Sequence, residues 1–248
     1  LYHRAASRLV VATSYKGLHA LPYVPRNLDH PQLARFLALH PMVPGSTIYE
    51  GIGRLPPAHS LTTDGSGWTV RRYWSLDPDA EIRLARDEDY REAFLELYGK
   101  VIRSHLRARG PVGIFMSGGL DSASVGAMAA RELRNGGKSL TAFTLVHQRT
   151  FDPGVDPASI NPEYAYVEAI RRMHPNVDVV YVTGKQDRLM DGFEESFERI
   201  GAPPNSISHD RRARALYRQV QARGIQVVLN GNQGNRTISY NGVDFLPR

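Results

Sequence analysis

The sequence predicts an α/β protein in which a parallel sheet carries helices on both faces and follows a smaller β-rich region. Short apolar runs alternate with segments of helical periodicity over residues 81–248, a pattern typical of parallel sheets. Residues 1–80 have a different texture, with Gly and Pro turns between short apolar runs. We therefore expect two domains, 1–80 and 81–248, and the 248 residues are enough for both.

The composition excludes several classes of protein. The chain has 31 Lys and Arg against 25 Asp and Glu, a formal net charge of +6, which favours anionic partners but equally describes an Arg-rich surface. It has no Cys, which excludes a disulfide scaffold, a Cys-ligated zinc site, an iron–sulfur cluster and a thiol nucleophile within these residues. We find no signal peptide and no apolar run long enough to cross a bilayer, so we expect a cytoplasmic location and no membrane partner.

In the first region, the apolar run 9–12 predicts a short strand, and residues 31–39 predict a short helix. The residues expected on one face of that helix are Leu33, Phe36 and Leu37. Residues 61–74 surround an Asp-Gly-Ser-Gly turn and predict a hairpin. Trp68 and Trp74 are expected to pack on this hairpin.

In the second region, local chemistry sets the expected helix boundaries. Three acidic residues begin a helix at 87, where the helix dipole favours negative charge, and Gly110 and Pro111 end it near 109. Its expected apolar positions are Tyr90, Phe94, Leu97, Tyr98, Val101, Ile102 and Leu106. The other expected helices are 122–134, ended by a Gly-Gly pair, 161–173, begun by an Asn-Pro pair, 188–200 and a helix around 213–220. The apolar runs between them predict strands over 112–116, 140–146, 177–182 and 225–229.

The segment SGGLDS, residues 117–122, lies between the first of these strands and its helix. Two glycines let the backbone approach a ligand closely, and the N–H groups of a helix N-terminus behind them favour an anion. Asp121 is unexpected in an anion site unless a cation accompanies the anion, as Mg²⁺ accompanies a polyphosphate. The alternative is a glycine-rich turn in which Ser and Asp only cap the helix. The segment matches neither the G-x-x-x-x-G-K-[ST] nor the G-x-G-x-x-G pattern.

SGGLDS after VGIFM resembles the pyrophosphate loop of the ATP pyrophosphatase superfamily, and the chain is similar to the asparagine synthetase class within it. The similarity extends to residues 9–24, 44–74, 161–170 and 224–235. The resemblance implies that 81–248 is an adenine nucleotide α-hydrolase-like domain lacking its C-terminal part. It implies that 1–80 is the C-terminal part of a glutaminase-like domain with a linker hairpin, so that the sequence is a fragment of a longer polypeptide.

The resemblance also implies a site for ATP and pyrophosphate. Its residues would be Met116, Ser117, Gly118, Gly119, Asp121, Ser122, Leu145, Asn230 and Gly231. Asp121 would be the magnesium ligand. Asn232 and Asn235 stand where the family usually carries Glu and Asp, which weakens a second metal ligand at Asn235 and removes a possible general base. No catalytic residue is assigned.

The implied activity is formation of an amide bond, in which ATP and Mg²⁺ adenylate a substrate carboxylate and pyrophosphate is released. Lasso-peptide macrolactam cyclases and β-lactam synthetases use an amine within the same substrate, and the departures favour the lasso-cyclase reading. Two alternatives stay open: a non-catalytic nucleotide-binding homologue, and a tRNA-modifying enzyme with the same loop. The expected partner is a small-molecule or peptide substrate rather than nucleic acid. A homodimer or a biosynthetic partner protein is left open.

Other polar residues have less specific interpretations. The nine His residues show no paired metal spacing. His105, within the long helix, is expected to be structural, whereas His147 follows a strand and is a candidate for substrate contact. The Arg residues of 211–218 are expected on a solvated face, with nucleic acid or a peptide as the alternative. Tyr164 and Tyr166 are expected to pack beside their helix.

Overall fold

A computed structural model describes residues 1–5, 8–64, 67–77, 79–146, 162–183, 188, 190–204, 206–234 and 239. The chain forms two compact units. The first unit is Leu1–Ile82 with Leu189–Asp210, and the second is Arg83–Arg188 with Arg211–Arg248. The predicted identities of 1–80 and 81–248 stay predictions, because compactness does not identify the ancestry of a domain.

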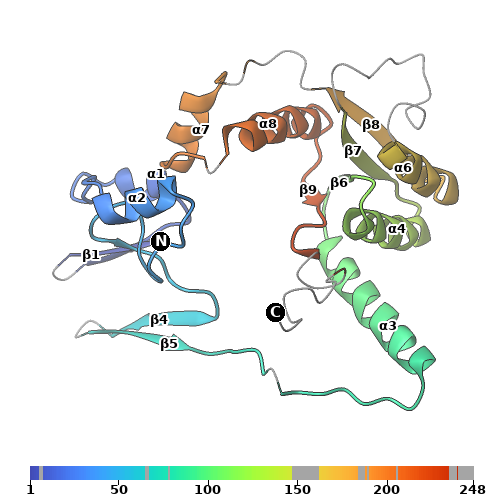
Figure 1. The fold of residues 1–248 in the computed structure, drawn as a ribbon, viewed down its shortest axis with the longest axis horizontal. Helices are drawn as coiled ribbons and strands as arrows, with labels where there is room; N and C mark the ends of the chain where they lie inside the picture. Colours follow the sequence, from blue (N-terminus) through green and yellow to red (C-terminus); the bar gives the residue numbers. More distant parts are fainter. Residues whose placement is uncertain are drawn as a thin grey trace, which may run out of the picture. The chain divides into compact units, whose positions relative to one another are not determined.

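The first unit contains small sheets and short helices (Figure 1). Its strands are β1 (Tyr2–Ala5), β2 (Arg8–Val11), β3 (Ile52–Gly53), β4 (His59–Thr63) and β5 (Trp68–Arg72). Its helices are α1 (Tyr15–His19), α2 (His30–Leu37) and α7 (Phe193–Ile200). An antiparallel sheet has the order β2-β1-β3, and β4 and β5 form a hairpin. A core of Tyr15, Leu18, Val24, Ile48, Tyr49, Ile52 and Ala202 holds this unit together.

Several predictions for this region are confirmed and others are wrong. The strand at 9–12 is β2, and the hairpin is β4–β5. The predicted helix 31–39 is α2, but Leu37 is 68% exposed and does not share the buried face. Trp68 packs against Tyr2 with ring centroids 5.4 Å apart. Trp74 lies beyond the hairpin and is 59% exposed, so its predicted packing is wrong.

The second unit is built on a sheet of four parallel strands in the order β8-β7-β6-β9. The strands are β6 (Val112–Phe115), β7 (Leu140–Val146), β8 (Val177–Thr183) and β9 (Val227–Leu229). The helices are α3 (Asp87–His105), α4 (Leu120–Asn135), α6 (Pro162–Met173) and α8 (Ile207–Ala222), which enters this unit at Arg211. The predicted alternation of strands and helices is confirmed.

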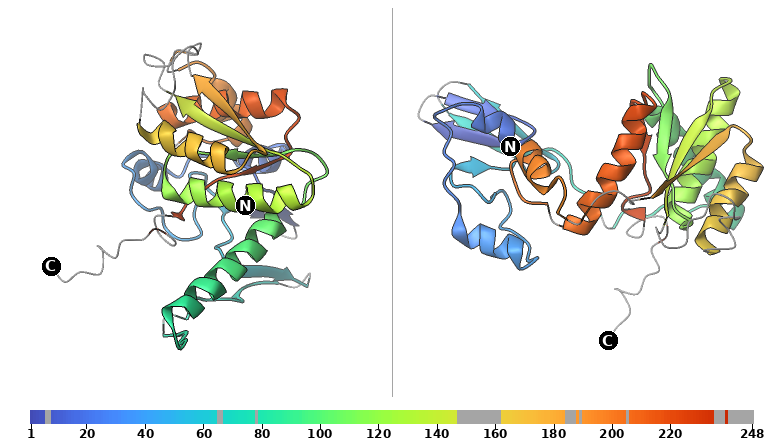
Figure 2. Two further views of the ribbon diagram at one scale, coloured as in Figure 1. Left: turned by 90° about the vertical axis from the view of Figure 1, so that its right-hand side faces the viewer. Right: turned by 90° about the horizontal axis from the view of Figure 1, so that it is seen from above.

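Helices cover both faces of this sheet, as predicted (Figure 2), and an apolar cluster lies on each face. On one face, Ile114 and Leu140 pack with α3, α4 and α6 through residues such as Ala129 and Val167. On the other face, Phe143 packs with α8 through Ala215. Among the described residues, no helix is long and apolar enough to cross a membrane.

Helix α3 differs from its prediction in two ways. It ends at His105 rather than near 109. The N–H of Leu106 makes the last helical hydrogen bond, to the carbonyl of Ile102, before the chain reaches Gly110 and Pro111. Of its predicted apolar positions only Ile102 is fully buried. Helix α7 also begins later than predicted, at Phe193, because Gly192 has a φ of +69° that a right-handed helix cannot contain.

Candidate functional site

The order of the strands creates a crevice at one edge of the sheet. The chain leaves β6 through α4 to β7 and then β8, and returns through α8, which covers the other face, to β9 on the far side of β6. Strand order therefore reverses between β6 and β9. Parallel α/β sheets bind ligands outside the carboxyl ends of the strands at such a reversal.

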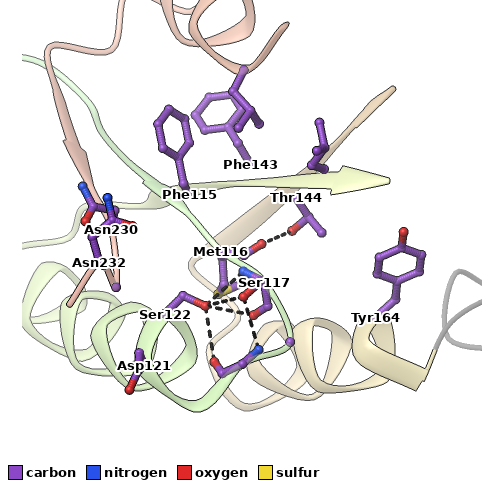
Figure 3. A pocket seen from close by; sticks show the side chains of 15 residues that line it. Phe115, Met116, Ser117, Asp121, Ser122, Phe143, Thr144, Tyr164, Asn230 and Asn232 are labelled. Carbon is purple, nitrogen blue, oxygen red and sulfur yellow. Dashed lines mark hydrogen bonds between the residues drawn. The ribbon is translucent and has the colours of Figure 1, made fainter. Parts of the chain in front are cut away.

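A pocket of about 450 Å³ lies at these strand ends, within the size range of small-molecule sites (Figure 3). Tyr164 of α6 lies at one end, and Asn230 and Asn232, after β9, lie at the other. The loop between β6 and α4 forms the floor between them. The lining residues are Phe115, Met116, Ser117, Gly118, Gly119, Asp121, Ser122, Phe143, Thr144, Leu145, Tyr164, Leu216, Asn230, Gly231 and Asn232.

The segment 117–122, which includes the first turn of α4, is held in shape by the buried hydroxyl of Ser122. The N–H of Ser117 donates to Ser122 Oγ over 3.0 Å, and the two hydroxyls are 3.0 Å apart. The Ser122 hydroxyl donates toward the carbonyl oxygens of Ser117 and Gly119, at 3.1 and 3.3 Å. The hydroxyl of Ser122 is thus engaged within the loop, whereas the Ser117 side chain is exposed at the pocket.

Helix α4 begins without a side-chain cap. Its N-cap residue is Gly119, in extended conformation, so the alternative in which Ser or Asp caps this helix is wrong. The first-turn N–H groups of an α-helix have no partner within the helix. Together with the positive end of the helix dipole, they make this side of the pocket suitable for an anion.

The ends of β6 and β7 are joined at the pocket by a buried threonine. Thr144 is 2% exposed, and its hydroxyl donates to the carbonyl of Met116 over 2.9 Å. The N–H of Met116 in turn donates to the carbonyl of Phe143 over 3.0 Å. A Cβ atom at Gly126 would lie 2.9 Å from Met116 Sδ, so α4 packs closely on this side chain. These contacts fix where Met116 stands in the pocket.

The loop after β9 packs directly on the first turn of α4. Asn230 Oδ1 accepts a hydrogen bond from the N–H of Asn232 over 3.0 Å. A Cβ atom at Gly231 would lie 2.6 Å from the amide nitrogen of Ser122, and one at Gly234 would overlap the carboxylate of Asp121. The close approach of this loop to the helix therefore depends on glycine at position 231, where the atoms met are backbone, whereas at position 234 the Asp121 side chain would have to move.

Asp121 has a carboxylate oxygen, Oδ1, that is buried and has no hydrogen-bond partner among the described residues. An ionised oxygen removed from water in this way is unfavourable unless a cation or a donor pairs with it. The side-chain amides of Asn230 and Asn232 line the same pocket and supply neutral oxygen donors. Carboxylate and amide oxygens suit Mg²⁺, so these residues fit that ion. The described residues contain no group of three or more His, Cys, Asp or Glu side chains that could hold a metal.

All nine residues predicted for the nucleotide site line this one pocket. Sequence reasoning missed Phe115, Phe143, Thr144 and Leu216, and assigned Tyr164 only to packing. Tyr164 is buried beside Tyr181, as expected, with ring centroids 6.1 Å apart, and it also faces the pocket. Position at a strand end is the signal that could have found Thr144.

Four predicted positions lie outside the described residues or differ from expectation. Asn235 and His147 lie outside the described residues. Tyr166 is 61% exposed, so its predicted packing is wrong. Arg214 is 6% exposed and does not lie on a solvated face. His105 is exposed at the end of α3, where its Nδ1 lies 2.9 Å from the carbonyl of Val101, a local structural contact.

The sequence matches a known protein family and several characterised relatives. Residues 93–238 match the family model described as "Asparagine synthase". The chain is 30% identical over 139 residues, 56% of its length, to "Asparagine synthetase [glutamine-hydrolyzing] 3" of Bacillus subtilis. It is 30% identical over 205 residues (75% of the chain) to "Amidase chyE" of Penicillium rubens and 27% identical over 194 residues (76%) to "Amidase chry2" of Gibberella zeae. The matched segments span 22%, 28% and 29% of these relatives.

Proposed function

The chain belongs to the asparagine synthase family, and from that membership we propose that it forms amide bonds after activating a carboxylate with ATP. The observation that carries the proposal is the SGGLDS segment at the strand-order reversal, whose last three residues form the first turn of α4, a turn without a side-chain cap. This arrangement offers N–H groups and a helix dipole to a polyphosphate. We assign residues 81–248 to an adenine nucleotide α-hydrolase-like fold and 1–80 to a glutaminase-like ancestor, and expect the protein to work in the cytoplasm.

The proposed reaction has two steps. A carboxylate oxygen of the substrate attacks the α-phosphorus of ATP, the bond from the α-phosphorus to the bridging oxygen breaks, and pyrophosphate leaves. The nitrogen of an amine then attacks the activated carbonyl carbon, AMP leaves, and the amine loses a proton to complete the amide. In the first step, negative charge grows on the departing pyrophosphate, and the fixed N–H donors of α4 with the Ser117 hydroxyl would stabilise it. Met116 and Leu145 would lie against the nucleotide, and Asn230 and Gly231 would approach it from β9.

Asp121 would hold the magnesium ion, with Asn230 and Asn232 as neutral oxygen donors. When bound, the ion would offset the charge of the phosphate oxygens. Because Asn232 and Asn235 are amides where the resemblance leads one to expect acids, the site has less negative charge, and we expect weak affinity for the free metal.

For the second step we propose that the amine belongs to the same substrate, as in lasso-peptide cyclases. The amides at Asn232 and Asn235, which depart from the acids that the resemblance leads one to expect, favour this choice. Incubation with ATP, Mg²⁺ and linear peptides that carry a free N-terminal amine and an acidic side chain should yield a product lighter by one water. Products formed only with added ammonia would instead favour synthesis of asparagine or a similar amide.

The nucleotide site can be tested separately from the acceptor. Titration calorimetry should detect binding of ATP with Mg²⁺, and Asp121→Asn should weaken it at least about tenfold, a loss expected of one ionic contact. Asp178→Asn is the matched control, because Asp178 is exposed near the opposite end of β8. Absence of ATP binding by the unmodified protein, or equal affinity in both variants, would contradict the proposed site.

A non-catalytic nucleotide-binding role is the second candidate. The observation that favours it is Asn232, which lines the pocket where the resemblance leads one to expect Glu. If this role is correct, the unmodified protein binds ATP but makes no AMP with any carboxylate, and the double variant Asn232→Glu, Asn235→Asp binds Mg²⁺ more tightly. Formation of AMP and pyrophosphate by the unmodified protein would exclude this candidate.

A further inference from the structure

The pocket at the strand ends has a polar side and an apolar side, which lie on opposite faces of the sheet. Figure 3 shows Phe115 and Phe143 on the other side of the strands from Ser122 and Asp121 of α4. Phe115 packs with the apolar cluster beneath α8, whereas Met116, the next residue, belongs to the cluster beneath α4. Successive side chains of an extended segment point to opposite faces, so the two kinds of surface meet where β6 ends.

The apolar side, which we call the apolar shelf, consists of Phe115, Phe143 and Leu216. Phe143 is 1% exposed and lies at its base, whereas Phe115 and Leu216 are partly exposed. The rings of Phe115 and Phe143 meet edge to face with centroids 6.4 Å apart, and the rings of Phe115 and Tyr217 do so at 5.4 Å. Aromatic contacts of this kind fix the shape of the shelf before a ligand arrives.

The charges around the pocket suit a substrate that is neutral near its reacting carboxylate. Among the described residues that line the pocket there is no Lys, Arg or His, and Asp121 is the one charged residue. A second carboxylate on the substrate finds no cation among these residues, and burial of an unpaired charge is unfavourable. An apolar group meets no such cost and gains free energy when it leaves water.

The proposed reaction also determines from which side the acid approaches. In a displacement at phosphorus the attacking and leaving oxygens lie roughly in line. The pyrophosphate is assigned to the first turn of α4, so the carboxylate reaches the α-phosphorus from the opposite side, where the apolar shelf lies. The group attached to the carboxylate then meets Phe115 and Leu216.

We propose that the apolar shelf binds an aromatic or branched aliphatic group that the substrate carries beside its reacting carboxylate. In a peptide substrate, this group is the side chain of a residue next to the acidic one. The inference rests on the proposed function, which assigns the phosphates to α4 and the nucleotide to Met116 and Leu145. It adds the chemical class of the acid.

The first test is binding of 3-phenylpropionate to the full chain, measured by saturation-transfer NMR with and without AMP. It should bind at least about tenfold more tightly than succinate, which has a carboxylate in place of the ring. Equal affinity for the two acids would overturn the proposal without the use of any variant.

A variant pair locates the probe on the shelf. Leu216→Asn makes one wall polar without adding charge and should weaken binding of 3-phenylpropionate at least about threefold. Leu216→Met keeps the wall apolar and should bind as the unmodified protein does. Leu37→Asn is the matched control, because Leu37 is 68% exposed on α2 and does not line the pocket. Equal affinity in Leu216→Asn and Leu37→Asn would overturn the assignment to the shelf.

The second test separates the shelf from the nucleotide. Calorimetry with Mg²⁺ should give similar ATP affinities for Leu216→Asn and the unmodified protein. Weaker binding of ATP with unchanged binding of pyrophosphate would assign the shelf to the adenine base and overturn this inference, while the nucleotide site itself would stand. Absence of ATP binding by the unmodified protein would contradict the proposed function, whereas selective binding of 3-phenylpropionate would still support the apolar shelf.

The source of the apolar group can be read from two capped dipeptides, Phe-Asp and Ser-Asp. Tighter binding of the Phe-Asp dipeptide would support the proposal with a peptide as substrate. Equal binding of the two dipeptides, beside selective binding of 3-phenylpropionate, would support it with a small apolar acid as substrate.

Discussion

At Gly231 the space that a side chain would occupy is filled by the backbone of α4. The nearest atoms are the Ser122 nitrogen, at 2.6 Å from an ideal Cβ, the Asp121 carbonyl carbon, at 2.8 Å, and the Ser122 Cα, at 2.9 Å. Backbone atoms cannot rotate away as a flexible side chain can. A side chain at Gly231 must therefore move either the loop after β9 or the first turn of α4, and both line the pocket.

We predict that Gly231→Ala lowers the free energy of unfolding by about 1–3 kcal/mol, the usual range for overpacking, and weakens ATP binding. Urea unfolding and calorimetry measure the two effects. Gly67→Ala serves as control, since a Cβ there meets nothing within 4 Å, and both quantities should stay near those of the unmodified protein. An unchanged urea midpoint in Gly231→Ala would show that the loop does not pack on α4 in solution.

Residues of the site differ in how far the sequence could predict them. Ser117 to Ser122 are contiguous, so a local pattern was sufficient to predict that these residues lie together at the end of a strand, where they line one pocket. Thr144 and Leu216 reach the same pocket from β7 and α8. Their contribution depends on strand order, since only the placement of β9 beside β6 and of α8 over the second face brings them together. No local pattern contains that information.

At the scale of elements, prediction succeeded best for the central strands of the parallel sheet. Strand β7 has the predicted bounds, 140–146, because a Gly-Gly pair lies shortly before a run of apolar residues and threonines, all of which suit a strand. Strand β3 has two residues, and its pairing with β1 joins positions about fifty residues apart, so no window of sequence could indicate it. Helix α3 was predicted correctly as a helix, but its buried residues were not. Apolar residues at helical spacing look alike in the sequence whether they face the core or the solvent.

His174, which follows α6, should make folding stability depend on pH. Burial, followed by the positive charges of Arg134 and Arg131, lowers the pKa of His174 below its ordinary value. The unfolded chain therefore takes up a proton at this residue more readily than the folded chain, and stability falls as the pH drops below about 6.5.

We expect His174→Gln to reduce that dependence. Urea unfolding measured between about pH 7.5 and pH 5 should show a smaller loss of stability in the variant than in the unmodified protein. Burial also lowers the pKa of His19, but His19 is present in both proteins and its contribution cancels in the comparison. Parallel curves for the two proteins would show that His174 titrates alike in the folded and unfolded chains.

At the scale of the whole molecule, the first unit is not a continuous piece of chain. It takes in Leu189–Asp210, which the sequence analysis had expected to continue the second domain. The Tyr49 hydroxyl donates to the carbonyl of Gly201 over 2.6 Å, and Ala202 joins the core of Tyr15, Leu18 and Ile52. The amphipathic pattern of α7 indicates a helix but not which core it joins, so this arrangement could not be predicted from one sequence.

We predict that residues 1–82 expressed alone are less stable than the same residues in the full chain, because the fragment leaves the site of Gly201 and Ala202 on Tyr49 and Tyr15 uncovered. Hydrogen exchange of the Leu18 and Ile52 amides reports the difference. A synthetic peptide of residues 189–210, added in excess, should restore part of the protection. Equal protection in the fragment and the full chain, with no effect of the peptide, would contradict this prediction.

Because Leu189–Asp210 belongs to the first unit, the first unit is discontinuous in sequence, and this limits how recombination can exchange it. The polypeptide passes between the two units at residues 82–83, 188–189 and 210–211, so three junctions join them. A single genetic crossover exchanges everything on one side of one junction. A crossover at residue 82 would combine residues 1–82 of another protein with α7 of this one. The segment of α7 would then meet residues other than Tyr15 and Tyr49, which it contacts here. Recombination can therefore exchange the first unit intact only when residues 1–82 and residues 189–210 are exchanged together.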